Sequence, residues 1–293
     1  MTDAIGCRIC GSDKTSLLYA LDFSDVMRCS GCGVAFLHPL PPWEVTKDIY
    51  DQGDRYFTGN PVYFGLEGEG RSQDDPAIAD YHRALEDLTL AAPGRDLLDV
   101  GCAAGTFLDI AQRKGWKTRG VELSEWASRR ARQEHNLDVV TGTLEQAAFP
   151  EASFDVVTMW DVLEHVPDPV QLLVEAKRIL RPGGVLYVNT ISYHSLLNLM
   201  AHVAHRASLG LVTWPLRRLF GLHHIYYFSR ESLLYTIGSA GFSDVRVELG
   251  EYHPERVDNI SVLMRLIFKV VYKLQEGTDY STVVAAHAKA PEP

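Results

Sequence analysis

The run from Leu97 to Thr106 constrains the fold of this chain most, because an apolar stretch breaks into a loop of small residues and then opens a helical pattern. In α/β proteins, such a strand, loop and helix make room for a nucleotide-like ligand at the carboxyl end of the strand. Gly101 and Gly105 have the spacing Gly-x-x-x-Gly, which differs from the Gly-x-Gly-x-x-Gly of loops that bind a pyrophosphate. A phosphate is therefore not the obvious ligand of this loop.

A carboxylate ends the next expected strand. The run from Lys117 to Glu122 closes on an acid, and an acid at this position is well placed to accept hydrogen bonds from both hydroxyls of a ribose. Asp99, the glycine loop and Glu122 together indicate an adenosyl ligand.

Strand and helix patterns alternate through most of the chain. Ser124, Asp168 before Pro169, and Ser229 are expected helix caps. This alternation predicts an α/β fold with a doubly wound sheet and a ligand at the carboxyl ends of its strands. The expected strands cover residues 95–100, 117–122, 137–140, 154–159, 185–191, 245–249 and 282–287.

Four segments give the chain a family resemblance between about residues 95 and 243. They are Leu98-Asp-Val-Gly-Cys-Ala-Ala-Gly105, Val121-Glu-Leu-Ser124, the stretch around Trp-Asp-Val-Leu-Glu-His after the fourth strand, and Leu180-Arg-Pro-Gly-Gly184. In this order they resemble the class I S-adenosylmethionine-dependent methyltransferases, specifically the small-molecule branch. The resemblance implies a Rossmann-like, seven-stranded methyltransferase sheet and S-adenosyl-L-methionine (SAM) as cofactor.

The resemblance also implies how the cofactor is held. Gly101 and Gly105 let the backbone approach the ligand, Glu122 binds the ribose, and Leu123 and Leu144 flank the adenine. Two positions depart from the family pattern, because alanine stands where a middle glycine is frequent and threonine where an aspartate near the adenine is frequent. These two positions are Ala103 and Thr143. The resemblance implies that both contact the cofactor, together with Asp99, Trp160 and Asp161.

Four of the five cysteines form two pairs, Cys7-x-x-Cys10 and Cys29-x-x-Cys32. This spacing is typical of a zinc ribbon, in which four thiolates hold one structural Zn²⁺ that is closed to substrate. Two disulfides or a redox pair are the alternative reading of the same pattern. The sequence therefore predicts a metal site at Cys7, Cys10, Cys29 and Cys32.

Three histidines are candidates for a catalytic base. Methyl transfer from a sulfonium needs in-line alignment and, for a hydroxyl acceptor, removal of a proton. His165 follows the fourth strand and His194 the fifth. His224 directly precedes Ile-Tyr-Tyr-Phe-Ser, and together they resemble the family's His-x-x-x-Phe-Ser segment. We expect His224 to be the first candidate because its aromatic neighbours suit an acceptor site, although histidines at such places are also often structural.

A metal-assisted reaction is an alternative to an unassisted one. Asp161, Glu164 and His165 have the spacing i, i+3, i+4 at an expected helix start. This arrangement is similar to the metal-assisted site of quinone-biosynthesis relatives, with aspartate in place of their first glutamate.

Length and pattern suggest the domain organisation. The chain has 293 residues, 46% of them hydrophobic, which suits about two domains. We expect a zinc ribbon over residues 1–45, a linker and N-terminal cap over 46–90, and the methyltransferase domain over 91–293. Residues 194–222 interrupt the sheet pattern and are expected to form a helical lid. Aromatic residues in the segment 50–64 suit either a bridge across the cofactor mouth or a loop pinned by aromatics.

Residues 256–275 predict an amphipathic helix, with apolar residues on one face and Arg265, Lys269 and Lys273 on another. Three positions suit such a helix: a membrane surface, the sheet of its own chain, or a second subunit in a homodimer.

Charge and apolar pattern exclude several classes of protein. A net charge of −10 argues against a nucleic-acid partner, because such proteins usually carry a basic surface. The N-terminus lacks the pattern of a secretory signal. The apolar region 196–212 is interrupted by His202, His205 and Arg206 and makes a poor membrane span. We therefore expect a cytoplasmic protein.

These observations predict an enzyme that methylates a small-molecule acceptor, with O-methylation of a sugar or natural-product intermediate as the first expectation. The ribbon before this type of core also resembles sugar C-methyltransferases, so C-methylation of a nucleotide sugar is an alternative. Less favoured alternatives are RNA base methylation and a SAM-binding protein without turnover.

Overall fold

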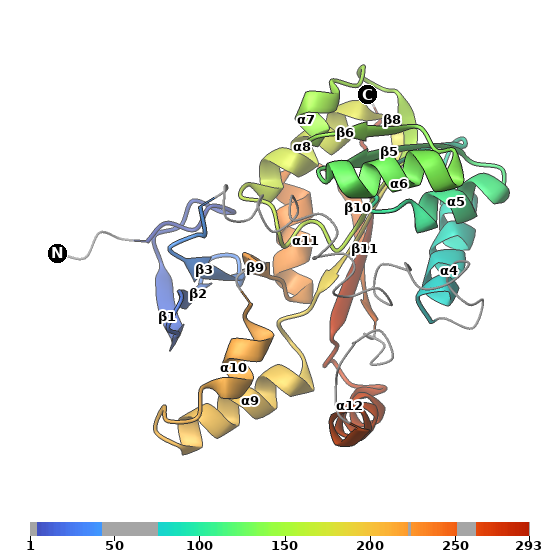
Figure 1. The fold of residues 1–293 in the computed structure, drawn as a ribbon. Coiled ribbons are helices and arrows are strands. Elements are labelled where there is room, and N and C mark those ends of the chain that lie inside the picture. Colours follow the sequence, from blue (N-terminus) through green and yellow to red (C-terminus); the bar gives the residue numbers. More distant parts are fainter. Residues whose placement is uncertain (1–4, 43–75, 222–223, 251–261, 293) are drawn as a thin grey trace.

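The predicted seven-stranded sheet is present in the computed structural model, which describes residues 5–42, 76–221, 224–250 and 262–292. Its strand order is β10-β11-β8-β7-β4-β5-β6 (Figure 1). The five strands from β8 to β6 are parallel, and β11 runs antiparallel to both β8 and β10. The strands are β4 (Asp96–Val100), β5 (Lys117–Glu122), β6 (Val139–Thr141), β7 (Phe154–Trp160), β8 (Leu180–Ile191), β10 (Ser243–Gly250) and β11 (Val283–Lys289).

Helices cover both faces of this sheet. Adjacent strand residues point to opposite faces, so Leu97 of β4 packs with the helices α4 and α5, whereas Leu98 packs with α8 and α11. Because both faces are buried, the central strands are almost continuously apolar, as is usual for parallel sheets. The helices are α4 (Pro76–Ala91), α5 (Thr106–Arg113), α6 (Glu125–His135), α7 (Leu144–Ala147), α8 (Pro169–Ile179) and α11 (Arg230–Ser239).

The three predicted helix caps are confirmed. The Ser124 hydroxyl accepts a hydrogen bond from the amide of Ala127 at the start of α6. Asp168 accepts one from Gln171 at the start of α8, and Ser229 caps α11 in the same way.

The expected helix start at residues 161–165 is wrong. Residues 161–168 form turns, and α8 begins only at Pro169. Asp161 has a φ of 53°, in the left-handed region. Residues that precede a proline also disfavour the helical region, and here Pro167 and Pro169 follow each other closely. The segment between β7 and α8 is therefore a shaped loop.

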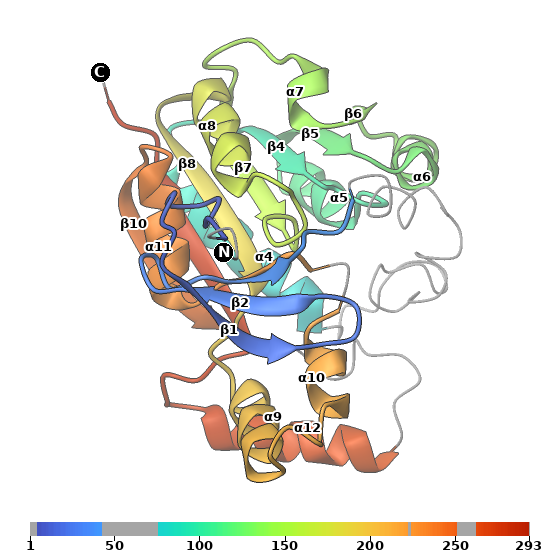
Figure 2. The ribbon, with the colours of Figure 1, turned by 90° about the vertical axis from the view of Figure 1, so that its left-hand side faces the viewer.

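The N-terminal strands form a second sheet with a late segment of the chain. β1 (Thr15–Ala20), β2 (Asp25–Cys29) and β3 (Ala35–His38) are antiparallel, and β9 (Tyr226–Tyr227) pairs with β3. Figure 2 shows this small sheet in front of the large one. The ribbon segment is thus joined by backbone hydrogen bonds to residues that lie between β8 and β10 in the sequence, a pairing that the sequence did not predict.

Alternating residues bury both faces of the small sheet. Met27, Phe36 and Tyr226 belong to the same buried cluster as the core between the large sheet and α8. Val26 and Leu37 point the other way, toward the helices α9 (Leu196–Ala207) and α10 (Trp214–Leu219). The small sheet is therefore an inner layer of the molecule.

Two helices occupy the segment expected to form a lid, and α12 (Val262–Gln275) lies in the segment expected to be an amphipathic helix. In both ribbon views α9, α10 and α12 lie together at the lower end of the molecule (Figures 1 and 2). None of the described helices has the length and apolar character needed to cross a bilayer. The segment 50–64 lies outside the described residues, and the domain boundaries at residues 45 and 90 stay a prediction.

Candidate active site

The loop after β4 has the backbone shape that its glycines permit. Gly101 and Gly105 have φ values of 73° and 89°. A Cβ atom on Gly101 would lie 2.5 Å from the side chain of Val162, and one on Gly105 would lie 2.4 Å from Leu137. Ala103 has a φ of 47°, so it adopts the left-handed conformation in spite of its Cβ atom. The loop keeps a conformation that suits glycine even where alanine stands.

Glu122 joins this loop to the end of β5. One carboxylate oxygen accepts a hydrogen bond from the Ala103 amide at 2.9 Å, and the other accepts one from the Ser124 amide at 2.8 Å. Burial raises the pKa of Glu122, and the bonds from the backbone oppose this shift. Each carboxylate oxygen has a second lone pair, so these bonds fix the carboxylate and leave acceptor sites for a ribose.

Asp99 is buried at the base of the same loop. Its Oδ1 atom accepts a hydrogen bond from the hydroxyl of Thr158, at 2.6 Å, on the neighbouring strand β7. Burial, with a smaller contribution from the charge of Glu122, raises the pKa of Asp99 to about 8. The shift favours the protonated form of this carboxyl group, which Thr158 holds inside the sheet.

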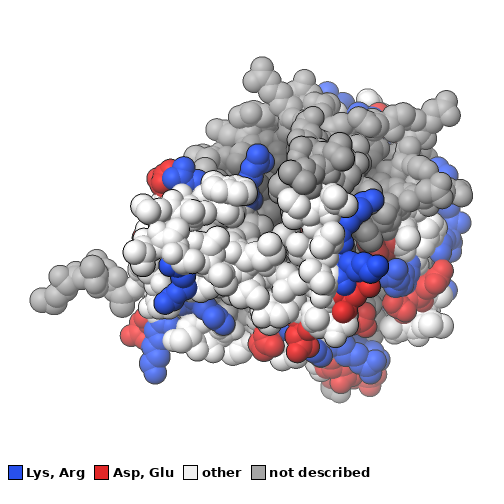
Figure 3. Space-filling view, turned by 90° about the horizontal axis from the view of Figure 1, so that it is seen from below, with Lys and Arg blue, Asp and Glu red and all other residues white. Residues whose placement is uncertain are grey.

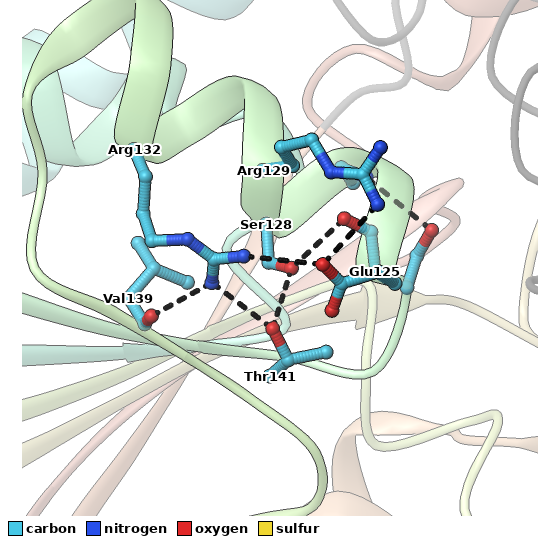
Figure 4. A network of polar contacts seen from close by, with 8 residues as sticks. Glu125, Ser128, Arg129, Arg132, Val139 and Thr141 are labelled. Carbon is cyan, nitrogen blue, oxygen red and sulfur yellow. Dashed lines mark hydrogen bonds and ion pairs between the residues drawn. The ribbon is translucent and has the colours of Figure 1, made fainter.

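A polar network holds α6 against β6, beside the expected adenine side of the site (Figure 4). Arg132 donates to the carbonyl oxygen of Val139 and to the hydroxyl of Thr141, both at 3.0 Å. The Ser128 hydroxyl lies 2.8 Å from that of Thr141, and Glu125 contacts Arg132 at 3.5 Å. The network fixes the end of β6, from which the chain continues into α7.

Thr143 and Leu144 follow at that end. The Thr143 hydroxyl accepts a hydrogen bond from the amide of Gln146, and the Gln146 side chain accepts one from the Thr143 amide, which makes Thr143 the cap of α7. Leu144 is buried and Leu123 is half-buried. Adenine contacts of these three residues stay a prediction.

Trp160 and Asp161 end β7. The Trp160 ring packs against Tyr81 and Tyr187, with ring centroids 4.8 Å apart in both cases. Its indole nitrogen is buried and has no hydrogen-bond partner among the described residues. Asp161 donates its amide to Asn189 of β8, at 2.9 Å, from a left-handed backbone conformation. Such backbone outliers concentrate at functional sites.

The structure brings two of the three candidate bases together. The rings of His165 and His224 have centroids 4.7 Å apart, and the ligand atoms of Glu164 and both histidines lie within 4.8 Å of one another. The Glu164 carbonyl oxygen accepts hydrogen bonds from the amides of Ile225, at 2.7 Å, and Tyr226, at 3.1 Å. These backbone bonds place His224 against the loop that carries His165.

The Glu164 carboxyl group is buried beside the histidines. Its Oε2 atom accepts a hydrogen bond from Thr190, at 2.7 Å, and its Oε1 atom has no partner among the described residues. Burial and the nearby charge of Asp161 raise the pKa of Glu164 to about 8. Sequence reasoning placed Glu164 only in a metal motif, because its contact with His224 depends on the tertiary fold.

His194 lies elsewhere in the fold. Its side chain is exposed, and its ring packs on Tyr280 with centroids 4.5 Å apart. Among the described residues, His194 is not part of the cluster formed by Glu164, His165 and His224.

Residues 71–247 match the family model described as "Methyltransferase domain". This match covers more than half of the chain. The chain belongs to this methyltransferase family. The expectation of a SAM-dependent methyltransferase, which rested on four segments of the sequence, is confirmed.

Relatives of this methyltransferase are named for an O-methylation. It is 32% identical over 170 residues to the ubiquinone biosynthesis O-methyltransferase of Paracidovorax citrulli (strain AAC00-1), covering 55% of this chain and 68% of the relative. It is 37% identical over 108 residues to the protein of the same name from Hahella chejuensis (strain KCTC 2396), covering 35% of this chain and 45% of that relative. The methyltransferase thus spans about two thirds of the first relative and less than half of the second.

Solved structures share the fold at low identity. Phosphoethanolamine N-methyltransferase 2 of Haemonchus contortus, in complex with SAM, has a TM-score of 0.58 at 18% identity, over 88% of this chain and 62% of the other. The [4+2]-cyclase SpnF has a TM-score of 0.58 at 19% identity, over 87% and 99%. Because these names describe different reactions, the fold alone leaves the reaction of the methyltransferase open.

The four N-terminal cysteines converge in the methyltransferase as their spacing predicted. Their sulfur atoms lie within 4.8 Å of one another, with Cys7 and Cys32 at 3.6 Å and Cys10 and Cys29 at 3.5 Å. A disulfide needs about 2.0 Å, whereas thiolates on a tetrahedral zinc ion lie about 3.8 Å apart. The cluster therefore fits one metal ion better than two disulfides.

Proposed function

We propose that this methyltransferase transfers a methyl group to a hydroxyl oxygen of a small-molecule acceptor, a sugar or natural-product intermediate. The observation that carries the proposal is the group formed by His165, His224 and Glu164 at the carboxyl end of the sheet. The names of the relatives, which describe an O-methylation, support the same reaction type.

The cofactor side of the reaction belongs to the loop after β4 and to Glu122. SAM, when bound, supplies a methyl group that is already activated, and the acceptor oxygen takes this group as it gives up a proton. Glu122 accepts from the ribose hydroxyls, and the glycine loop lets the backbone approach the cofactor. Leu123 and Leu144 flank the adenine, with Thr143 beside it. Trp160 and Asp161 border the methionine portion.

His224 takes the acceptor proton in this proposal, and His165 assists it. An imidazole has an unperturbed pKa near 6.5, which suits proton removal at neutral pH. Tyr226 and Phe228 pack in the adjoining core and keep this side of the site dry.

A divalent cation at the same three residues is the second candidate. The buried Oε1 atom of Glu164 has no hydrogen-bond partner among the described residues. With the two imidazoles it forms a donor set of one oxygen and two nitrogens, which fits a transition metal. A bound cation would lower the pKa of the acceptor hydroxyl. The residues that hold it would be Glu164, His165 and His224.

We also propose that Cys7, Cys10, Cys29 and Cys32 hold one structural Zn²⁺. Gly11 and Gly33 close the two knuckles, with hydrogen bonds from their amides to the carbonyl oxygens of Cys7 and Cys29. All four ligand positions are then taken by the protein, which leaves no open position for catalysis.

Mass spectrometry tests the proposed reaction. The enzyme is incubated with SAM that carries a trideuteromethyl group and with a panel of hydroxylated aromatics, sugars and nucleotide sugars. We expect one labelled methyl group on an acceptor oxygen, and the carbon shift of that group in NMR distinguishes it from a methyl group on carbon. To test the divalent cation, the assay is repeated after treatment with a chelator and again after the metal is added back. Labelled product with the methyl group on carbon contradicts the proposal.

A further inference from the structure

The lower end of the molecule exposes an unusual amount of apolar surface. Ten of the sixteen exposed large apolar side chains among the described residues lie on α9, on α12, on the segment that connects α9 to α10, or at the first residue of α10. We define these ten as the end surface: Leu199, Met200, Val203, Leu209, Leu211, Trp214, Leu266, Ile267, Val270 and Leu274. Single exposed apolar residues are common, but a group of this size marks an interaction site.

The helix α12 presents apolar residues on both sides. Val271, Tyr272 and Gln275 are buried against the rest of the protein. The outer side carries Leu266, Ile267, Val270 and Leu274 where a helix on a water-facing surface would carry polar residues. Among the described residues, one face of α12 is therefore buried and the other is exposed.

The connection from α9 to α10 is exposed in the same way. Leu209 is 93% exposed, Leu211 87% and Trp214 64%. Leu209 also has a φ of 52°, at a position after a helix where glycine or asparagine is usual. A leucine there costs backbone strain, and 93% exposure means that the fold gains almost no burial from it.

The charge of this region is opposite to that of the whole chain. The methyltransferase has 28 Lys and Arg against 38 Asp and Glu. The stretches 196–221 and 262–275 carry six basic residues and no acidic one. Arg217 is paired with Asp22, whereas Arg206, Arg218 and Lys273 are exposed. Figure 3 views this end and shows a broad uncharged area with Lys and Arg on it and Asp and Glu toward its edges.

We propose that the end surface binds the interface of an anionic lipid membrane. Apolar side chains next to exposed basic ones are the pattern of a protein that inserts into the boundary of headgroups and acyl chains. The aromatic ring of Trp214 suits this boundary as well. A second protein would need apolar area, but it gives no reason for the excess of basic over acidic residues on α9, α10 and α12.

Sedimentation with vesicles tests the proposal on the full chain. The probes are phosphatidylcholine vesicles alone and phosphatidylcholine vesicles with a third of phosphatidylglycerol. We expect binding to the anionic vesicles that falls as salt is added, because salt screens the basic residues. The variant Lys273→Gln should weaken the partition by about fivefold, as expected for one basic residue at an anionic surface.

A matched pair of substitutions isolates the apolar contact. Leu211 and Leu90 are both 87% exposed, and Leu90 lies on α4, outside the end surface. Leu211→Glu should reduce binding at least tenfold, and Leu90→Glu should leave it unchanged, with equal melting temperatures for both. Equal binding of the two variants, or no binding to either vesicle, overturns the proposal. A stable dimer that Leu211→Glu dissociates also overturns it, because a second copy would then cover this surface.

Discussion

The imidazole rings of His165 and His224 lie with centroids 4.7 Å apart and planes inclined by 41°, although one precedes β8 in the sequence and the other follows it. The contact depends on the backbone bonds that Glu164 accepts from Ile225 and Tyr226. The two rings therefore belong to one site, and the effects on turnover of substituting each of them should not be additive.

His224→Ala should lower turnover by roughly a hundredfold to ten-thousandfold, the usual contribution of a general base, with little change in SAM affinity. His165→Ala should lower turnover less, and the double variant should resemble His224→Ala alone. His194→Ala is the comparison, because its ring lies against Tyr280. Steady-state kinetics with a verified acceptor checks this. A loss of less than tenfold for His224→Ala would assign it to shaping the pocket.

Glu122→Ala should weaken the binding of SAM and S-adenosylhomocysteine by about 1 to 3 kcal/mol, because hydrogen bonds to a charged group are lost. The substitution also frees the amides of Ala103 and Ser124, so the loop loses one of its links to β5 and keeps the backbone bonds from Gly101 and Cys102 to Val121. Calorimetry gives both affinities. Glu134→Ala, which removes an exposed carboxylate near the end of α6, should leave them unchanged, and equal affinities for the two variants would contradict the assignment.

One zinc ion per chain is expected by elemental analysis, and Cys10→Ser should abolish it. Removal of the ion should lower the melting temperature, because a segment of this size has little core of its own. Turnover should fall by a larger factor than SAM affinity. The reason is that Leu37 of β3 donates a hydrogen bond to the Ile225 carbonyl oxygen, beside His224, so a disturbed β3 also disturbs that segment. Cys102→Ala is the matched control at the fifth cysteine. Metal-free protein with unchanged melting and activity would reject the site.

Asp99→Asn should gain stability relative to the parent protein as the pH rises. The pKa of Asp99 is about 8 in the folded state and 3.8 in the unfolded one, so the folded state holds a proton that the unfolded chain releases. Between pH 4 and 8 this lowers the free energy of unfolding of the parent by up to about 1.4 kcal/mol per pH unit. Asparagine has no proton to release and still accepts from Thr158. Melting temperatures of both proteins at pH 5 and pH 8 measure the difference in stability between variant and parent. This difference does not change with pH if Asp99 is ionised in the folded state.

The sequence predicted the large sheet well because its signals are local. Apolar runs, capping residues and glycine stops act within a few residues, and the caps at Ser124, Asp168 and Ser229 are present as predicted. The cysteine spacing works in the same way, since each pair makes its own knuckle. Local rules failed at residues 161–165, where a helical spacing of polar residues proved to be a turn before closely spaced prolines.

Contacts between distant segments escaped prediction. Nothing in Tyr226-Tyr227 indicates that its partner is Ala35-Phe36, because a two-residue strand has no pattern of its own. The pairing of His224 with Glu164 follows from this arrangement. A signal did exist in the consecutive apolar residues of β2 and β3, such as Val26-Met27 and Phe36-Leu37. Such a run predicts a strand covered on both faces, so the sheet needs cover from elsewhere in the chain.

The pairing of β3 with β9 also determines when the small sheet can be completed during translation. The first three strands leave the ribosome early, yet the partner of Phe36 is Tyr226, roughly 190 residues later. At about 5 to 20 residues per second, the edge of β3 stays unpaired for roughly ten to forty seconds. During that time it offers free amides and carbonyls to any other nascent strand.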